Sequence, residues 1–165
     1  MMAVFIIQNK NEGWNEFLKD VKIPLDKAMA YLKEGNVDDA RKKINYAITN
    51  IGNYTETMGS ETLSDFKWRI NTLNGLMGVS PKDIDIAYQL VTEQMRIEQL
   101  SENLTKNVKA TLNDVESDAR IGGNKTIISA TEAYKEAIHA TIGNTSEILI
   151  AIDNELKSLG YVESE

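Results

Sequence analysis

The fold is decided by residues 80–124, SPKDIDIAYQLVTEQMRIEQLSENLTKNVKATLNDVESDARIGGN. Ser80 can cap a helix, and Pro81 suits the first helical position because its missing N–H is not needed there. No glycine or proline follows until Gly122. The stretch therefore predicts one helix over 81–121, about 40 residues and roughly 60 Å long.

A tight reversal is expected directly after this helix, at Gly122 and Gly123. Asn124 can cap a following helix, which the apolar periodicity extends over 125–159, and Gly160 supplies a C-terminal stop. The two long helices are thus predicted to form an antiparallel hairpin.

Three shorter helices are predicted upstream, over about 12–34, 37–58 and 61–77. Each carries apolar residues at spacings of three and four, which places them on one side of a helix. The three stripes are Trp14, Phe17, Val21, Leu25, Ala28 and Leu32; Val37, Ala40, Ile44, Ala47, Ile48, Ile51, Tyr54 and Met58; and Leu63, Phe66, Ile70, Leu73 and Met77. Pro24 lies inside the first stripe, so that helix either kinks there or restarts with Pro24 in its first turn.

The long helix over 81–121 has two apolar faces at its beginning and one at its end. The first face holds Ile84, Ala87, Tyr88, Val91 and Met95, and the second holds Ile86, Leu90, Ile97 and the later apolar residues. We expect the shorter helices to cover the first face and the helix over 125–159 to cover the second. Since alternating apolar and polar runs are absent, the predicted fold is an all-α five-helix bundle, with three shorter helices packed against the long hairpin in a single domain over 1–165.

Residues 30–48, AYLKEGNVDDARKKINYAI, resemble one tetratricopeptide hairpin, with Gly35, Ala40 and Ala47 at the small-residue positions of that repeat. The resemblance implies a close-packed helix pair and peptide or protein binding. It covers about one eighth of the chain, and no second copy follows at a period of about 34 residues. We interpret the segment as a generic close-packed helix pair.

The composition argues against several classes of function. The net charge of −7 disfavours nucleic acid and anionic membrane surfaces as partners. The absence of cysteine excludes disulfides, thiolate metal sites and a cysteine nucleophile. The apolar opening over residues 1–7 is too short to span a bilayer and does not have the pattern of a secretion signal, so a cytoplasmic location is expected.

The single histidine, His139, does not support a catalytic or metal site. Glu136 and His139 have the Glu-x-x-His spacing of di-iron bundles, but both are expected on the side of their helix away from its apolar stripe. No nucleophile elbow is present. We therefore predict no catalytic residue, no metal and no cofactor, and we favour a protein that is not an enzyme.

Four residues are candidates for an interface: Trp68, Tyr134, Ile138 and Ile142. Trp68 is predicted to point away from the apolar stripe of its own helix, toward either a second layer or a partner. Tyr134, Ile138 and Ile142 belong to an apolar face of helix 125–159 that is broader than one neighbouring helix requires.

The function that these features predict is that of a non-catalytic helical interaction or assembly protein, which self-associates into a homodimer through the long hairpin. The sequence leaves open whether a second copy or the shorter helices of the same chain cover the broad face. An alternative is a ligand-binding or enzymatic helical bundle with a pocket between helices, and a further protein partner of unknown identity stays open as well.

Overall fold

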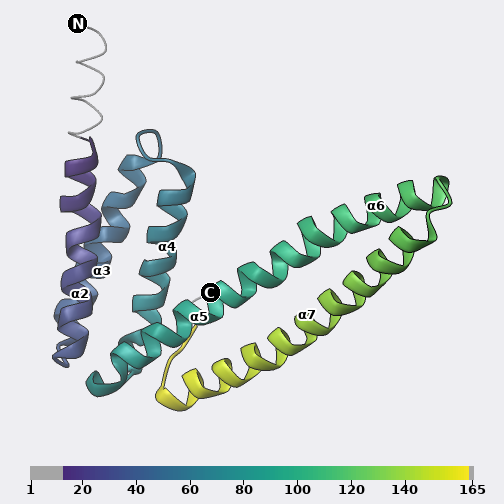
Figure 1. Ribbon diagram of the computed structural model, residues 1–165. Coiled ribbons are helices and arrows are strands. Elements are labelled where there is room, and N and C mark those ends of the chain that lie inside the picture. Colours follow the sequence, from purple (N-terminus) through teal and green to yellow (C-terminus); the bar gives the residue numbers. More distant parts are fainter. Residues whose placement is uncertain (1–12, 164–165) are drawn as a thin grey trace, which may run out of the picture. The chain divides into compact units, whose positions relative to one another are not determined.

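The computed structural model describes residues 13–163, and these residues form helices without any strand. Figure 1 shows the helices α2 to α7 in chain order. Over the described residues the fold is all-α with five helical segments, as predicted. The expectations for the N-terminal residues 1–12 lie outside the described residues.

The chain divides into two compact units. The first contains the residues up to Tyr88 together with those from Leu156 onward, and the second contains Gln89–Glu155. The boundary runs through two helices, α5 and α7, and not through a flexible linker. A single domain over 1–165 stays a prediction.

The first helical segment runs without a break past Pro24, through a π turn. Helical residues 13–17 continue into a π turn, Leu18–Lys22, in which the N–H of Ile23 donates to the carbonyl of Leu18, and α2 (Ile23–Lys33) follows. Pro24 follows directly on this π turn, whose wider hydrogen-bond spacing accommodates a residue without an N–H. The backbone keeps helical angles at Lys22 and Ile23, so the helix does not stop and start again at Pro24.

Helix α3 (Val37–Ile51) begins at a well-formed cap. Gly35 has a φ of 80°, the Asn36 N–H donates to the carbonyl of Tyr31 over 2.8 Å, and the Asn36 side chain accepts from the N–H of Asp39. The prediction that this helix continues to Met58 was wrong. It ends at Ile51 and tightens into a 3-10 turn, Gly52–Tyr54, because Gly52 and Asn53 are weak helix formers.

Helix α4 (Ser60–Gly75) is followed by the 3-10 turns Leu76–Gly78 and Pro81–Asp83, from which α5 (Ile84–Asn103) starts. The core of the first unit gathers buried apolar side chains from α2 to α5, from the segments that join them and from the end of α7. They are Phe17, Val21, Leu25, Ala28, Leu32, Ala40, Ile44, Ala47, Ile51, Tyr54, Leu63, Phe66, Ile70, Leu73, Leu76, Val79, Ile84, Ala87 and Leu156.

Three predicted core positions of the first unit are exposed to solvent: Trp14, Ile48 on α3 and Ile86 on α5. The ring of Trp14 still stacks on the buried Phe17, with 5.8 Å between the ring centroids. Ile86 lacks the expected cover because α7 ends at Leu159, after which the chain turns at Gly160 and the N–H of residue 162 donates to a carbonyl of α4.

The second unit is a two-helix hairpin. Helix α5 passes through a π turn, Leu104–Val108, into α6 (Lys109–Ile121), and α7 (Lys125–Leu159) returns from the tight turn between them, as Figure 1 shows. Gly123 adopts a φ of 69°, and the Asn124 side chain caps α7 by accepting from the N–H of Ile127. Helix α7 has the predicted bounds 125–159, and α6 ends at the predicted residue 121. The single helix predicted over 81–121 begins instead with the 3-10 turn Pro81–Asp83, and it is α-helical from Ile84 onward except at its π turn.

Candidate functional site

An open apolar groove of about 390 Å³ lies between the two helices of the second unit. Its lining residues are Leu104, Val108 and Leu112 on one helix and Tyr134, Ala137, Ile138 and Thr141 on the other. No lining residue is charged, and the only polar groups are the hydroxyls of Tyr134 and Thr141. One of these is already used, since the Thr141 hydroxyl donates to the carbonyl of Ala137.

The π turn contributes one wall of the groove, because Leu104 and Val108 are its first and last residues. A π turn widens the helix and shifts the direction in which side chains project, and such turns are frequent at functional sites. Val108 remains 37% exposed. This wall therefore has apolar surface that the hairpin itself does not cover.

Helix α7 supplies both the floor and the rim of the groove. Ile138 is buried at the floor, whereas Tyr134 is 63% exposed at the rim. Two of the predicted interface residues are thus brought together on one apolar surface.

The other two predicted interface residues lie elsewhere. Ile142 is half-buried on α7 and does not line the groove. Trp68 belongs to the first unit, where it is half-buried and its ring meets that of Tyr88 edge-on at 6.1 Å between centroids. Trp68 therefore meets a second layer of the first unit, α5.

Two threonines of α7 are buried in the hairpin, and one of them, Thr145, bonds to the facing helix. The hydroxyls of Thr145 and Ser101 lie 2.8 Å apart across the hairpin, and Thr145 also hydrogen-bonds to the carbonyl of Ile142. Thr131 is buried in the same way, with its hydroxyl on the carbonyl of Ile128. These hydroxyls are satisfied, so their burial carries little penalty.

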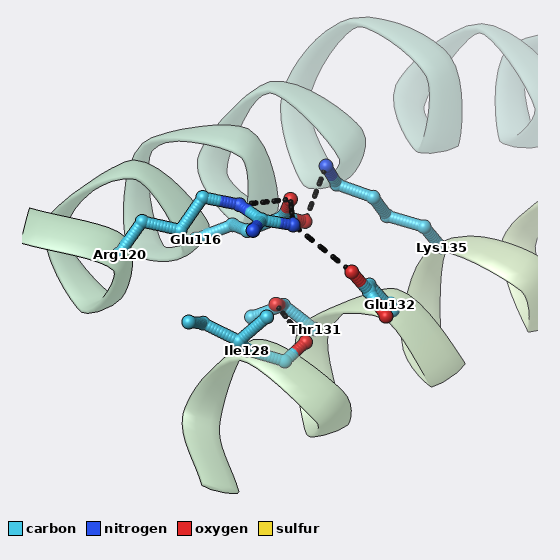
Figure 2. A network of polar contacts seen from close by, with 6 residues as sticks. All are labelled: Glu116, Arg120, Ile128, Thr131, Glu132 and Lys135. Atoms are coloured by element: carbon cyan, nitrogen blue, oxygen red, sulfur yellow. Dashed lines mark hydrogen bonds and ion pairs between the residues drawn. The ribbon is translucent and has the colours of Figure 1, made fainter. Parts of the chain in front are cut away.

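A charged network ties α6 to α7 near the tip, as Figure 2 shows. The Glu116 carboxylate forms ion pairs with the guanidinium of Arg120 on its own helix, at 3.0 Å, and with the ammonium of Lys135 on α7, at 2.8 Å. The Arg120 guanidinium also pairs with the carboxylate of Glu132 at 3.0 Å. The hydrogen bonds from Lys135 and then Arg120 hold the pKa of the Glu116 carboxyl below its usual range. The charged side chains of this network thus pair with one another and join the two helices near the tip.

Sequence reasoning missed part of the groove. Leu104, Val108 and Leu112 were expected to contact the facing helix and be covered by it. Ala137 was not singled out as an interface residue, and Thr141 was not predicted to belong to the apolar face of α7. Two features of the sequence together could have indicated the groove. Apolar residues recur every four positions at Leu104, Val108 and Leu112, and the small residues Ala137 and Thr141 follow Tyr134 on the facing helix.

The described residues show neither a metal site nor a membrane span. Within 13–163 no three His, Asp or Glu side chains come close enough to hold a metal ion, and His139 is exposed. None of the helices in that range combines the length and apolarity that crossing a bilayer requires.

Comparison of the chain with protein-family models, with curated proteins and with solved structures finds no significant match.

Proposed function

We propose that this chain is a non-catalytic assembly protein that self-associates into a homodimer through the apolar groove of its hairpin. The observation that carries the proposal is the open groove beside Tyr134, whose ring is 63% exposed. Large aromatic side chains beside uncovered apolar surface are typical of protein interfaces.

A two-helix hairpin cannot enclose a core, and this supports a second copy as the occupant of the groove. In the second unit few side chains are buried: Val91, Ala119, Thr131, Ile138 and Thr145. Two hairpins packed face to face form a four-helix bundle, in which each covers the apolar flank of the other.

The apolar lining of the groove also favours a second copy of this chain over a different protein as the partner. An acidic chain attracts basic partners through its charged surface, but the groove lining offers them no carboxylate. The alternative of an enzyme or ligand-binding bundle draws less support, because the groove is open and provides only two hydroxyl groups.

The test is the molar mass of the full chain by light scattering after size-exclusion chromatography. We expect a mass near twice the 18.5 kDa of one chain. Tyr134→Glu places a charge at the rim of the groove and should shift the protein to the monomer.

The matched control is Ser129→Glu, an exposed position on the same helix that does not line the groove, and it should leave the dimer intact. A wild-type protein that stays monomeric at high concentration contradicts the proposal.

A further inference from the structure

The groove residues of α7 are arranged symmetrically along the chain. Tyr134 and Thr141 lie equally far from a point between Ala137 and Ile138, and these two residues flank that point. The facing helix repeats the pattern, with Leu104 and Leu112 each four residues from Val108. A twofold rotation that reverses the helix direction therefore places Tyr134 of one copy opposite Thr141 of the other, and Ala137 opposite Ile138.

Both centres lie at the same height in the hairpin. The hydroxyls of Ser101 and Thr145 meet at 2.8 Å and fix the register of the two antiparallel helices. Seven residues beyond Ser101 is Val108, and seven residues before Thr145 is Ile138. One twofold axis can thus pass through the middle of the groove and relate both helices at once, which an isologous interface requires.

Charge distinguishes between the two ways in which two hairpins can stack. The tip half, residues 109–135, carries four basic and four acidic side chains, whereas the base half, residues 89–108 and 136–155, carries two basic and seven acidic ones. Stacking with both tips at the same end brings the two acidic halves together. Stacking head to tail places the balanced half over the acidic half and avoids this repulsion.

Resting on the self-association proposed above, we infer that the second copy packs head to tail, about a twofold axis at the level of Val108 and Ile138. Helix α7 then lies antiparallel to the partner copy of α7, and the exposed ring of Tyr134 sits opposite the small Thr141 of the other chain. The interface extends along α7 from Ile127 to Ile148, a length of about 30 Å, and it is two helices wide. It buries roughly 600 Å² of surface per copy, which is near the lower limit for a specific interface.

The absence of native cysteines permits a clean cross-linking test. Ile127 and Ile148 are 40% and 48% exposed and lie equally far on either side of the inferred axis. We expect Ile127→Cys mixed with Ile148→Cys to form a disulfide between the two variants under mild oxidation. Either variant alone should not cross-link, because its two sulfurs would be about 30 Å apart, well beyond disulfide reach.

A matched control uses Ser129→Cys with Ser146→Cys, two exposed positions that are also symmetric about the axis but do not line the groove. This pair should stay unlinked. Variants that carry tags of different size make the mixed disulfide visible on a non-reducing gel.

Each outcome of the experiment has one meaning. A mixed disulfide from the Ile127 and Ile148 variants, without one from the serine pair, supports the head-to-tail dimer. A dimer by light scattering that lacks this disulfide, or in which Ile127→Cys links to itself, overturns the head-to-tail arrangement and leaves self-association standing. A chain that is monomeric by light scattering overturns both.

Discussion

At the scale of single residues, Gly75 makes room for the C-terminal segment of the chain. The half-buried ring of Tyr161 lies where a Cβ at position 75 would be, and the carbonyl oxygen of Val162 is only 2.7 Å from that point. The Val162 N–H in turn donates to the carbonyl of Gly75 over 3.1 Å. The absence of a side chain at this position thus lets residues 160–162 dock on the end of α4.

We therefore expect Gly75→Ala to destabilise the protein by about 1–3 kcal/mol, through overpacking. Urea denaturation measures the loss. Gly52→Ala is the matched control, since a Cβ at Gly52 meets nothing within 4 Å, and it should be neutral or slightly stabilising. If the clash is the cause, Gly75→Ala costs less in a Tyr161→Ala background, and an equal cost in both backgrounds argues against this explanation.

A second residue-scale contact joins Tyr54 to Asp20 in the π turn before Pro24. The Tyr54 hydroxyl donates to Asp20 over 2.5 Å, and its ring packs edge-on against Phe17. Burial, and next the hydrogen bond to Asp20, raise the pKa of Tyr54 well above its usual range. The folded state thus favours the neutral phenol.

Tyr54→Phe should lower the free energy of unfolding by about 1–2 kcal/mol at pH 7, since it removes a hydrogen bond to a carboxylate. The folded pKa lies above the unfolded value of about 10, so this contribution is fully present below pH 10 and is lost as pH rises further. Urea titrations at pH 7, 9 and 10.5 should show a constant difference between wild type and variant at the first two and a smaller one at the third. A difference that grows with pH contradicts the assignment.

At the scale of elements, the sequence predicts where helices begin and end best at positions where glycine, proline and asparagine act locally. The bounds of the long helices follow closely from Pro81, Gly122, Asn124 and Gly160, because each of these residues favours the start or the end of a helix through its backbone or its short side chain. The early end of α3 was missed, since Gly52 with Asn53 is only a weak helix breaker.

The interior of the hairpin could be predicted only in part, because hydropathy counts threonine as polar. Thr131 and Thr145 are buried in the hairpin since their hydroxyls bond to carbonyls one turn earlier, which makes them in effect small apolar residues. The π turn at Leu104–Val108 contains no proline or glycine that would indicate it in the sequence. The widening of the helix at this wall of the groove was therefore not predictable from periodicity, although the spacing of its apolar residues was visible in the sequence.

The tip of the hairpin provides a prediction at the same scale. Glu116 is the shared acceptor of Arg120 and Lys135, so Glu116→Gln should loosen the closure of α6 onto α7. We expect faster amide hydrogen exchange at the first turns of α7, with the helix content unchanged by circular dichroism.

Glu136→Gln is the control for this change, because it removes an acid from an exposed position of α7 outside the network. Exchange at the tip should then match the wild type. Equal acceleration in both variants would point to a general effect of charge and not to the network.

At the scale of the whole molecule, the two units differ in how they are stabilised. The first has a core of apolar side chains from every one of its helices, whereas the second buries few side chains within one chain. If a second copy supplies the missing core, the stability of the second unit depends on protein concentration and that of the first does not.

Thermal unfolding of the full chain should therefore show two transitions. The one assigned to the hairpin should move upward by about 3–5 °C for each tenfold rise in protein concentration, because mass action favours the dimer, while the other stays fixed. Differential scanning calorimetry over a hundredfold range measures both. In Tyr134→Glu the hairpin transition should lose its concentration dependence and occur at a lower temperature. In Ser129→Glu the transition should keep its concentration dependence. If the midpoint of the hairpin transition does not change with protein concentration in the wild type, each hairpin is stable as a monomer. That result contradicts self-association through the groove.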